Sequence, residues 1–542
     1  MYLYEELIRY GASGAYPFHM PGHKRRLGSL PDPYSFDITE IDGFDNLHHA
    51  EGVILEAEKR AAQLYGSEET HFLVNGSSCG ILAAISACCR RGSGRILMSR
   101  GSHKSAYHAV GLNGLEAVYL HPRQEGELNG SVLAEDVRRA LEEDRREGLG
   151  RISAVFITSP SYEGIVSDTA VIAETAHAFG LPLIVDEAHG AHFGMHKLFP
   201  ESSVKLGADI VIHSLHKTLP SLTQTALLHV NGELIDRRRL RRMLDTFQSS
   251  SPSYVLMASM DECIGMLREH GRELFERYAE ELIAFYGEWG INLSQIKKET
   301  GTVEKVRILD HFELLLTDDP SRILVCPAES DMTASDLYDI LRQDYHLQSE
   351  MLSLSYVLML SSVGDDREGF RRLSAALREM DRRISEKESG CHLAGTVAGA
   401  LREMDRHISE KERGCHRAGT VAGALREMDR HVSEKKAGYL PEEDPAGAPR
   451  ENGRLSLPRP EVCMRIREAE DAKLCRTPIS RSAGRVSGEY LYLYPPGVPL
   501  LVPGERIGEE VPALASELKA RGYSLQGLSD YSAESILTVK EE

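Results

Sequence analysis

The sequence predicts an α/β fold: a mostly parallel seven-stranded sheet in a large domain, with a smaller α/β domain in the C-terminal half. Three observations support this prediction. Between about residues 50 and 230, apolar runs alternate with helical patterns. Most of these runs are continuous rather than alternating, as is typical of strands covered on both faces. From about residue 255 onward, long amphipathic helices are followed by shorter strand patterns.

Seven apolar runs are expected to form the main sheet: 71–75, 95–99, 116–120, 154–159, 182–188, 209–214 and 225–230. Helical patterns precede several of them, for example at 54–64 and 167–179, and helical crossovers favour parallel pairing. Ligands bind such sheets at the carboxyl ends of the strands. Polar residues directly after each run are therefore the candidates for chemistry.

The chain divides into a loop-rich arm, a large domain and a smaller domain, at residues 1–45, 46–275 and 276–542. The smaller domain contains a tandem repeat of 24 residues, in which 376–399 recurs at 400–423 and a partial copy starts at Ala424. We interpret this insert, 376–436, as a recent in-frame duplication that is helical and exposed to solvent. Copying explains why Cys391-His392 recurs as Cys415-His416, without a metal site. A linker rich in proline, glycine and charge follows at 437–460.

Composition excludes several classes of partner. The 542 residues carry 63 Lys+Arg and 82 Asp+Glu, a net charge of −19 that repels nucleic-acid backbones. The longest uncharged apolar run, 80–89, is too short to span a bilayer, and the first residues do not resemble an export signal. Nine cysteines, including adjacent Cys88 and Cys89, fit a reducing compartment. We expect a cytoplasmic protein without nucleic-acid or membrane partners.

Two strand ends carry the strongest chemical signal. Lys217 follows the run 209–214, where a buried amine is costly unless it has a function, and such a lysine can form a Schiff base with a carbonyl compound. Asp186 ends another apolar run. A carboxylate in that position needs a cationic partner, and a protonated pyridine nitrogen would supply one.

Two further strand ends extend this pattern. Residues 75–78 read Asn-Gly-Ser-Ser and lead from a strand into a helix, where free amides and the hydroxyls of Ser77 and Ser78 can cradle a phosphate. Taken alone, Ser77 is more simply explained as a helix N-cap. His103 follows the next strand, where an imidazole can lie flat against an aromatic ring, although a solvated histidine is the simpler explanation for it alone.

Metal chemistry is the main rival interpretation. Asp186, His189 and His192 have the spacing of metal ligands, which would suit a metal-dependent hydrolase. His19 and His23 also invite a metal site, but the Pro-Gly between them favours a tight turn.

The phosphate cradle, the ring-stacking histidine, the aspartate and the lysine occur in the order needed to hold pyridoxal phosphate. With these motifs the sequence resembles the Orn/Lys/Arg decarboxylase family, pyridoxal-phosphate enzymes of the aspartate-aminotransferase-like fold (fold type I), in the compact form without an N-terminal wing domain. The matching stretches are 17–24, 37–54, 75–80, 102–109, 159–168, 185–194, 213–230 and 249–260. The resemblance covers residues 1–275 and continues more loosely at 492–507.

The resemblance implies a role for each matching position. Lys217 would form the internal aldimine with the cofactor, Asp186 would keep the pyridine nitrogen protonated, His103 would stack on the ring and His189 would lie near the ring hydroxyl. The phosphate-side positions are matched by Ser77, Ser78, Ser214 and His216. The family needs no metal. Residues 249–254 resemble a segment that reaches the neighbouring subunit's site, which implies a homodimer or a larger homo-oligomer.

The implied function is decarboxylation of a basic amino acid (lysine, arginine or ornithine) to the amine and carbon dioxide, as in polyamine biosynthesis. An aminotransferase or lyase of the same fold is the alternative. Glu40, Asp42 and Asp45 in the arm are possible partners for the substrate's cationic end, although solvated loop acids are the simpler interpretation of each.

Overall fold

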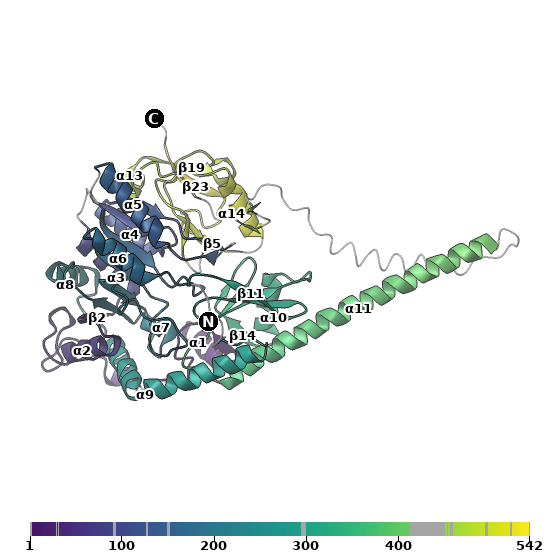
Figure 1. Ribbon diagram of the computed structural model, residues 1–542, viewed down its shortest axis with the longest axis horizontal. Coiled ribbons are helices and arrows are strands. Elements are labelled where there is room, and N and C mark those ends of the chain that lie inside the picture. The colour runs from purple at the N-terminus through teal and green to yellow at the C-terminus, as the bar shows by residue number, and fades with distance from the viewer. Residues whose placement is uncertain are drawn as a thin grey trace.

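The structure is a computed structural model in which one long helix projects from an otherwise rounded body (Figure 1). It describes residues 3–28, 30, 32–89, 94–125, 128–148, 152–293, 300–411, 450–451, 454–455, 459–493, 497–520 and 523–540. Within these residues, no helix is both long enough and apolar enough to cross a membrane.

The central sheet has seven strands in the order β2-β10-β9-β8-β7-β3-β4. Their bounds are Glu69–Leu73 (β2), Arg95–Ser99 (β3), Glu116–Leu120 (β4), Ile152–Thr158 (β7), Leu183–Asp186 (β8), Ile210–His213 (β9) and Ala226–Val230 (β10). Only β10 runs antiparallel to its neighbours. The predicted fold class and its mostly parallel seven-stranded sheet are therefore confirmed.

Successive residues of these strands enter two different hydrophobic cores. On β9, Val211 belongs to one core while Ile210 and Ile212 belong to the other. Because side chains alternate across a strand, a strand buried on both faces must be apolar at every position. This explains why the runs in the sequence are continuous.

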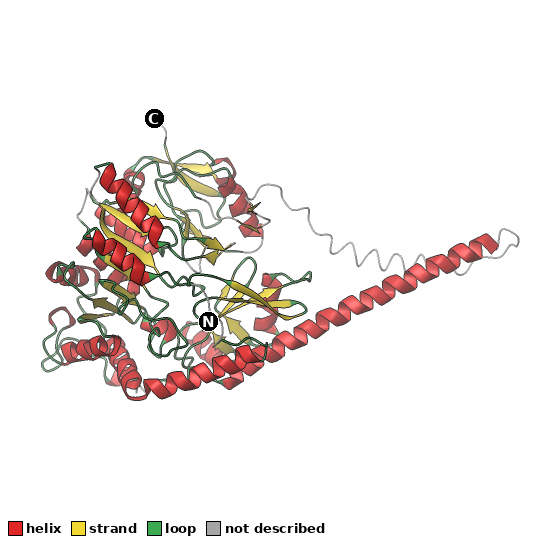
Figure 2. Ribbon diagram, viewed as in Figure 1, coloured by secondary structure: helices red, strands yellow, loops and turns green. Residues whose placement is uncertain are grey.

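Helices cover both faces of the sheet (Figure 2). One core takes buried residues from α3 (Gly76–Cys88), α4 (Lys104–Asn113) and α8 (Arg237–Phe247), and the other from α2 (Val53–Tyr65), α5 (Ala134–Arg146), α6 (Thr169–Ala178) and α9 (Tyr254–Gly287). The short helix α7 (Leu215–Thr218) lies between β9 and β10 in the chain. Short elements complete this part: α1 (Leu3–Ala12), η1 (Pro33–Ser35), η2 (Leu47–His49), β5 (Gln124–Glu125) and β6 (Leu128–Asn129).

The 34-residue helix α9 leads to a second, antiparallel sheet in the order β11-β12-β13-β16-β15. Its strands are Glu304–Leu309 (β11), Phe312–Leu316 (β12), Arg322–Pro327 (β13), Met351–Leu352 (β15) and Val357–Leu360 (β16), with α10 (Ala334–Gln343) and β14 (Leu347–Ser349) between them in the chain. Strand β1 (Tyr16–Phe18) of the arm pairs in parallel with β14. The arm is thus attached to an element made more than 300 residues later.

The last described segment packs against the large domain. It contains β17 (Arg450–Glu451), β18 (Arg454–Leu455), α13 (Ile466–Asp471), β19 (Leu474–Pro478), η3 (Ile479–Arg481), β20 (Leu491–Leu493), β21 (Pro499–Leu501), α14 (Glu510–Ala520), β22 (Leu525–Gln526) and β23 (Ser535–Val539). A buried ion pair between Arg100 and Glu505, 3.1 Å apart, joins it to the residue that follows β3.

The projecting helix is α11 (Arg367–Lys411), which contains the first repeat copy and half of the second (Figure 1). Among the side chains described in this helix, which end at residue 389, its buried apolar residues are Phe370, Leu373, Ala376, Leu377 and Met380. The rest of the repeat, including Cys415-His416, and residues 437–449 of the linker lie outside the described residues, as do the side chains of Cys391 and His392.

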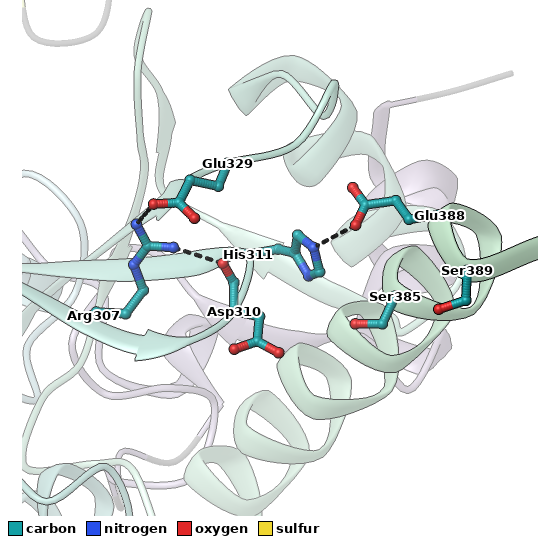
Figure 3. A pocket seen from close by; sticks show the side chains of 7 residues that line it. All are labelled: Arg307, Asp310, His311, Glu329, Ser385, Glu388 and Ser389. Carbon is teal, nitrogen blue, oxygen red and sulfur yellow. Dashed lines mark hydrogen bonds and ion pairs between the residues drawn. The ribbon is translucent and has the colours of Figure 1, made fainter. Parts of the chain in front are cut away.

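A polar pocket of about 700 Å³ marks where the repeat leaves the body (Figure 3). His311, beside the β11–β12 turn, is held by Asp381 at 3.0 Å and by Glu388 at 3.3 Å, both from the first repeat copy. Arg307 pairs with Glu329 across the same pocket. The described contacts of the repeat with the body are therefore made by its first copy.

This arrangement predicts unequal effects of two changes in α11. Leu377→Ala should lower the free energy of unfolding by about 2–5 kcal/mol, because it leaves a cavity at a fully buried position. Deleting 400–423 should leave the thermal midpoint unchanged, because the first copy keeps its contacts. Thermal unfolding followed by circular dichroism tests both; a large loss of stability on deletion would contradict the interpretation of the repeat as a dispensable duplication.

Candidate active site

The polar residues predicted from strand ends meet at one edge of the central sheet. Asp186 is the last residue of β8, and Ser214 follows β9 directly and begins the turn into α7. His216 and Lys217 lie on α7, and His103 caps the N-terminus of α4 after β3. The parallel order β9-β8-β7-β3 brings these ends together.

Lys217 is held by a histidine. Its Nζ lies 2.9 Å from Nε2 of His189, and the His189 ring contacts the ring of Tyr162 with centroids 4.6 Å apart. Burial lowers the pKa of Lys217 to about 8, although the carboxylates of Asp186 and Glu350 oppose the change. Burial, together with Lys217, lowers the pKa of His189 well below its usual value. An amine that loses its proton near pH 8 therefore faces a neutral imidazole.

Asp186 is almost enclosed, with 3% of its surface exposed. Its carboxylate accepts a hydrogen bond of 3.2 Å from the Ala188 amide. Burial raises the pKa of Asp186, and the nearby cation Lys217 opposes that rise. A further cationic N–H donor at this carboxylate would offset the cost of burying it.

His103 stands beside this group. Its Nδ1 lies 2.8 Å from the Ser105 hydroxyl and accepts a hydrogen bond of 3.3 Å from the Ser105 amide. Burial, followed by the charge of Lys217, lowers the pKa of His103 to about 3. The ring is thus neutral, fixed by its capping role, and within the electrostatic reach of Lys217.

The residues expected on the phosphate side flank the same edge. Ser77 and Ser78 belong to the first turn of α3, behind Gly76, whose φ of +75° favours glycine. His216 Nδ1 donates a 3.0 Å hydrogen bond to the Thr225 carbonyl, and burial lowers the pKa of His216 to about 4. Helix-start amides, hydroxyls and imidazoles suit an anion.

Four buried polar atoms around Lys217 have no hydrogen-bond partner among the described residues: Thr158 Oγ1, His189 Nδ1, Ser214 Oγ and Thr218 Oγ1. Buried polar groups are almost always satisfied, so these atoms indicate a polar ligand. Pyridoxal phosphate carries a pyridine nitrogen, a ring hydroxyl, an aldehyde and a phosphate. The unsatisfied atoms and the buried Asp186 carboxylate fit such a group.

The rival metal site is not formed in the part of the chain that the structure describes, where no group of three potential ligands is found. His192 turns to Asp319, with Nε2 3.3 Å from Oδ1. In the arm, His19 lies 2.5 Å from the Tyr10 hydroxyl, and His23 accepts a hydrogen bond from the Arg25 amide. These histidines fix turns and packing.

One of the three arm acids is held by backbone amides. Asp45 accepts hydrogen bonds from the amides of Gly52 and Ile54 at the start of α2. Besides Asp186, the structure brings a second carboxylate, Glu350, into the electrostatic reach of Lys217, and sequence reasoning missed this residue together with Arg322. Arg322 is fully buried and donates a 2.7 Å hydrogen bond to the His189 carbonyl. No motif marks either residue.

Comparison with known proteins identifies the family. Residues 2–298, more than half of the chain, match the family described as "Orn/Lys/Arg decarboxylase, major domain", and 458–523 match its C-terminal domain. The chain belongs to the Orn/Lys/Arg decarboxylase family. It is a decarboxylase, and pyridoxal phosphate is the cofactor that the family implies.

Relatives span the full chain. An arginine decarboxylase of Bacillus subtilis is 27% identical, covering 100% of this chain and 98% of its own length, and the uncharacterized B. subtilis protein YaaO is 30% identical over the same shares. The lysine decarboxylase LdcA of Pseudomonas aeruginosa is 25% identical, covering 95% of this chain and 75% of its own.

Solved structures show the same fold. The structure of lysine decarboxylase A from Pseudomonas aeruginosa aligns with a TM-score of 0.67 at 19% identity, covering 99% of this chain and 82% of that one. The constitutive lysine decarboxylase of Escherichia coli aligns with a TM-score of 0.64 at 19% identity, covering 90% and 74%.

The lowered pKa of Lys217 predicts how fast its amine reacts with added pyridoxal phosphate. Only the neutral amine attacks an aldehyde, so the rate should rise with pH and be half-maximal at about pH 8. Stopped-flow visible absorbance on cofactor-free protein measures this rate. Lys217→Arg should show no such phase, and a midpoint near the ordinary lysine value of about 10.4 would contradict the burial argument.

Proposed function

We propose that this decarboxylase acts on a basic amino acid (lysine, arginine or ornithine) and releases the corresponding amine and carbon dioxide. The observation that carries the proposal is the pairing of the Lys217 amine with neutral His189 beside the buried Asp186 carboxylate. Relatives named arginine or lysine decarboxylase support the class of substrate.

In this proposal three residues hold the reactive part of pyridoxal phosphate. Lys217 is its covalent anchor, Asp186 pairs with the pyridine nitrogen, and His189 lies at the ring hydroxyl through its unsatisfied Nδ1. Bound pyridoxal phosphate supplies an electron sink for the charge left when carbon dioxide departs. Asp186 keeps this sink open because its buried negative charge favours the protonated nitrogen.

The remaining residues orient and anchor the cofactor. The neutral His103 ring stacks on it without adding a positive charge. Ser77, Ser78, Ser214 and His216 bind the phosphate, for which the unpartnered Ser214 hydroxyl and the start of α3 provide donors. No metal ion is needed in this scheme.

Proton movement is assigned to the lysine and histidine pair. When its amine is free, Lys217 Nζ can take a proton from, or return one to, His189 Nε2 over 2.9 Å. Because both groups sit in a poorly hydrated site, the proton stays between them rather than exchanging freely with water. Lys217 is therefore the proposed donor that completes the amine product.

The proposal extends to assembly and location. Exposed apolar side chains in the arm and in the first turn of α2 support contact with a second subunit in a homodimer or larger homo-oligomer. They are Tyr34, Ile41, Phe44 and Val53, which are 92%, 49%, 48% and 57% exposed.

The seven described cysteines are all free, which supports a cytoplasmic protein. A cationic substrate agrees with the net charge of −19, and the amine product with a role in polyamine biosynthesis.

The test is an assay of the pyridoxal-phosphate-loaded protein with lysine, arginine and ornithine, measuring amine and carbon dioxide together. Equal release of both from at least one substrate is expected, and Lys217→Ala should abolish it. Lys205→Ala, at an exposed lysine paired with Glu201, is the matched control and should retain activity.

Other outcomes identify the rivals. Keto-acid formation without carbon dioxide would mark an aminotransferase. Activity that survives Lys217→Ala, in colourless protein that contains stoichiometric zinc, would mark a metal-dependent hydrolase.

A further inference from the structure

A glutamate from the antiparallel sheet completes one wall of the site. Glu350 stands between β14 and β15, and its amide donates a 3.0 Å hydrogen bond to the Leu358 carbonyl of β16. The backbone of Glu350 is therefore fixed by a hydrogen bond to a strand of the sheet. Its side chain is half-buried, in contrast to the enclosed Asp186.

Two donors from different parts of the chain fix the Glu350 carboxylate. The Tyr162 hydroxyl donates to Oε1 at 2.5 Å, and the Met20 amide donates to Oε2 at 2.9 Å. A carboxylate offers about four acceptor positions, so each oxygen retains capacity for a further donor. The group is thus preorganised and can still accept hydrogen bonds from a ligand.

A continuous series of contacts connects this carboxylate to the reactive amine. Tyr162 binds Glu350 through its hydroxyl and contacts the ring of His189, and His189 contacts Lys217 Nζ. Glu350 and Asp186 are the two carboxylates whose charge stabilises protonated Lys217. Glu350 is consequently separated from the reactive amine by two side chains, those of Tyr162 and His189.

We propose that Glu350 binds the terminal ammonium or guanidinium group of the substrate and sets the preference for basic amino acids. This inference rests on the proposed function and deepens it. A cation at a half-buried carboxylate that is already oriented forms a charge-assisted hydrogen bond without reorganising the site. An uncharged side chain would leave the carboxylate desolvated without compensation.

Other nearby carboxylates are committed to structural partners. Glu163 is buried and accepts hydrogen bonds from the hydroxyls of Ser161 and Tyr356. Asp319 contacts His192 and Arg322, and Asp365 accepts a hydrogen bond from Tyr16. Each of these has less than a tenth of its surface exposed, whereas Glu350 combines partial exposure with proximity to Lys217.

The test uses Glu350→Gln in the pyridoxal-phosphate-loaded protein, which removes the charge and keeps the shape. Its amide oxygen can still accept from the Met20 amide, and its NH2 group can donate to the Tyr162 hydroxyl. For the preferred cationic substrate, kcat/KM should fall about ten- to a hundredfold, mainly through a higher KM. The neutral analogues, norleucine for lysine and citrulline for arginine, should be turned over by Glu350→Gln no more slowly than by the unaltered protein. Visible absorbance and the thermal midpoint report that the cofactor and fold are intact.

Binding gives a second readout that does not depend on turnover. Calorimetry of the loaded protein should show that 1,5-diaminopentane binds more tightly than pentylamine, and Glu350→Gln should remove this difference. Glu350→Asp retains the charge and should keep part of the difference in affinity between the two amines. Glu329→Gln makes the same charge change at a glutamate whose side chain is 76% exposed, and should leave both amines unaffected.

The results distinguish failure of the proposed function from failure of the role assigned to Glu350. If the unaltered protein decarboxylates none of the three amino acids, the proposed function fails. If it does so but Glu350→Gln slows cationic and neutral substrates equally, or leaves both unchanged, the assignment of Glu350 is overturned while the proposed function stands.

Discussion

The structure depends on keeping a charged amine and a carboxylate out of water at the edge of a sheet. Lys217 and Asp186 are tolerable there because each lies in the field of the other and because His189 remains neutral. The two cores on either side of β8 and β9 supply the low-polarity surroundings, and the strands fix both backbones. Without that double burial the amine would be an ordinary solvated lysine, with a pKa of about 10.4 instead of about 8 and a far smaller reactive neutral fraction.

The arm closes this site by close backbone contact. The Gly22 amide donates to the His216 carbonyl at 2.8 Å, and a side chain at Gly22 would meet the Leu219 amide nitrogen at 2.7 Å. The same turn is anchored by Lys24, whose buried ammonium donates to the carbonyls of Pro17, His19 and Leu360. Positions on the arm and on α7 are thus coupled by main-chain contacts.

Sequence reasoning succeeded where a local pattern reflects burial. The continuous apolar runs gave all seven central strands, with β3 and β4 matching to the residue, and the polar residues after them gave the cluster around Lys217. It missed Glu350 and Arg322 because their roles arise only when the antiparallel sheet meets β8. Arg322 and the His189 carbonyl it binds are separated by 133 positions, and no periodicity encodes such a contact.

The pairing of β1 with β14 also fixes an order of events during synthesis. Tyr16 and its neighbours leave the ribosome first, yet Leu347, Leu360 and Asp365, which they contact, are translated more than 300 residues later. Contacts so distant along the chain form slowly and leave earlier segments without partners in the meantime. The first-made segment is therefore among the last to reach its native place, and a nascent chain shorter than about 365 residues has a nearly complete central sheet but an open active site.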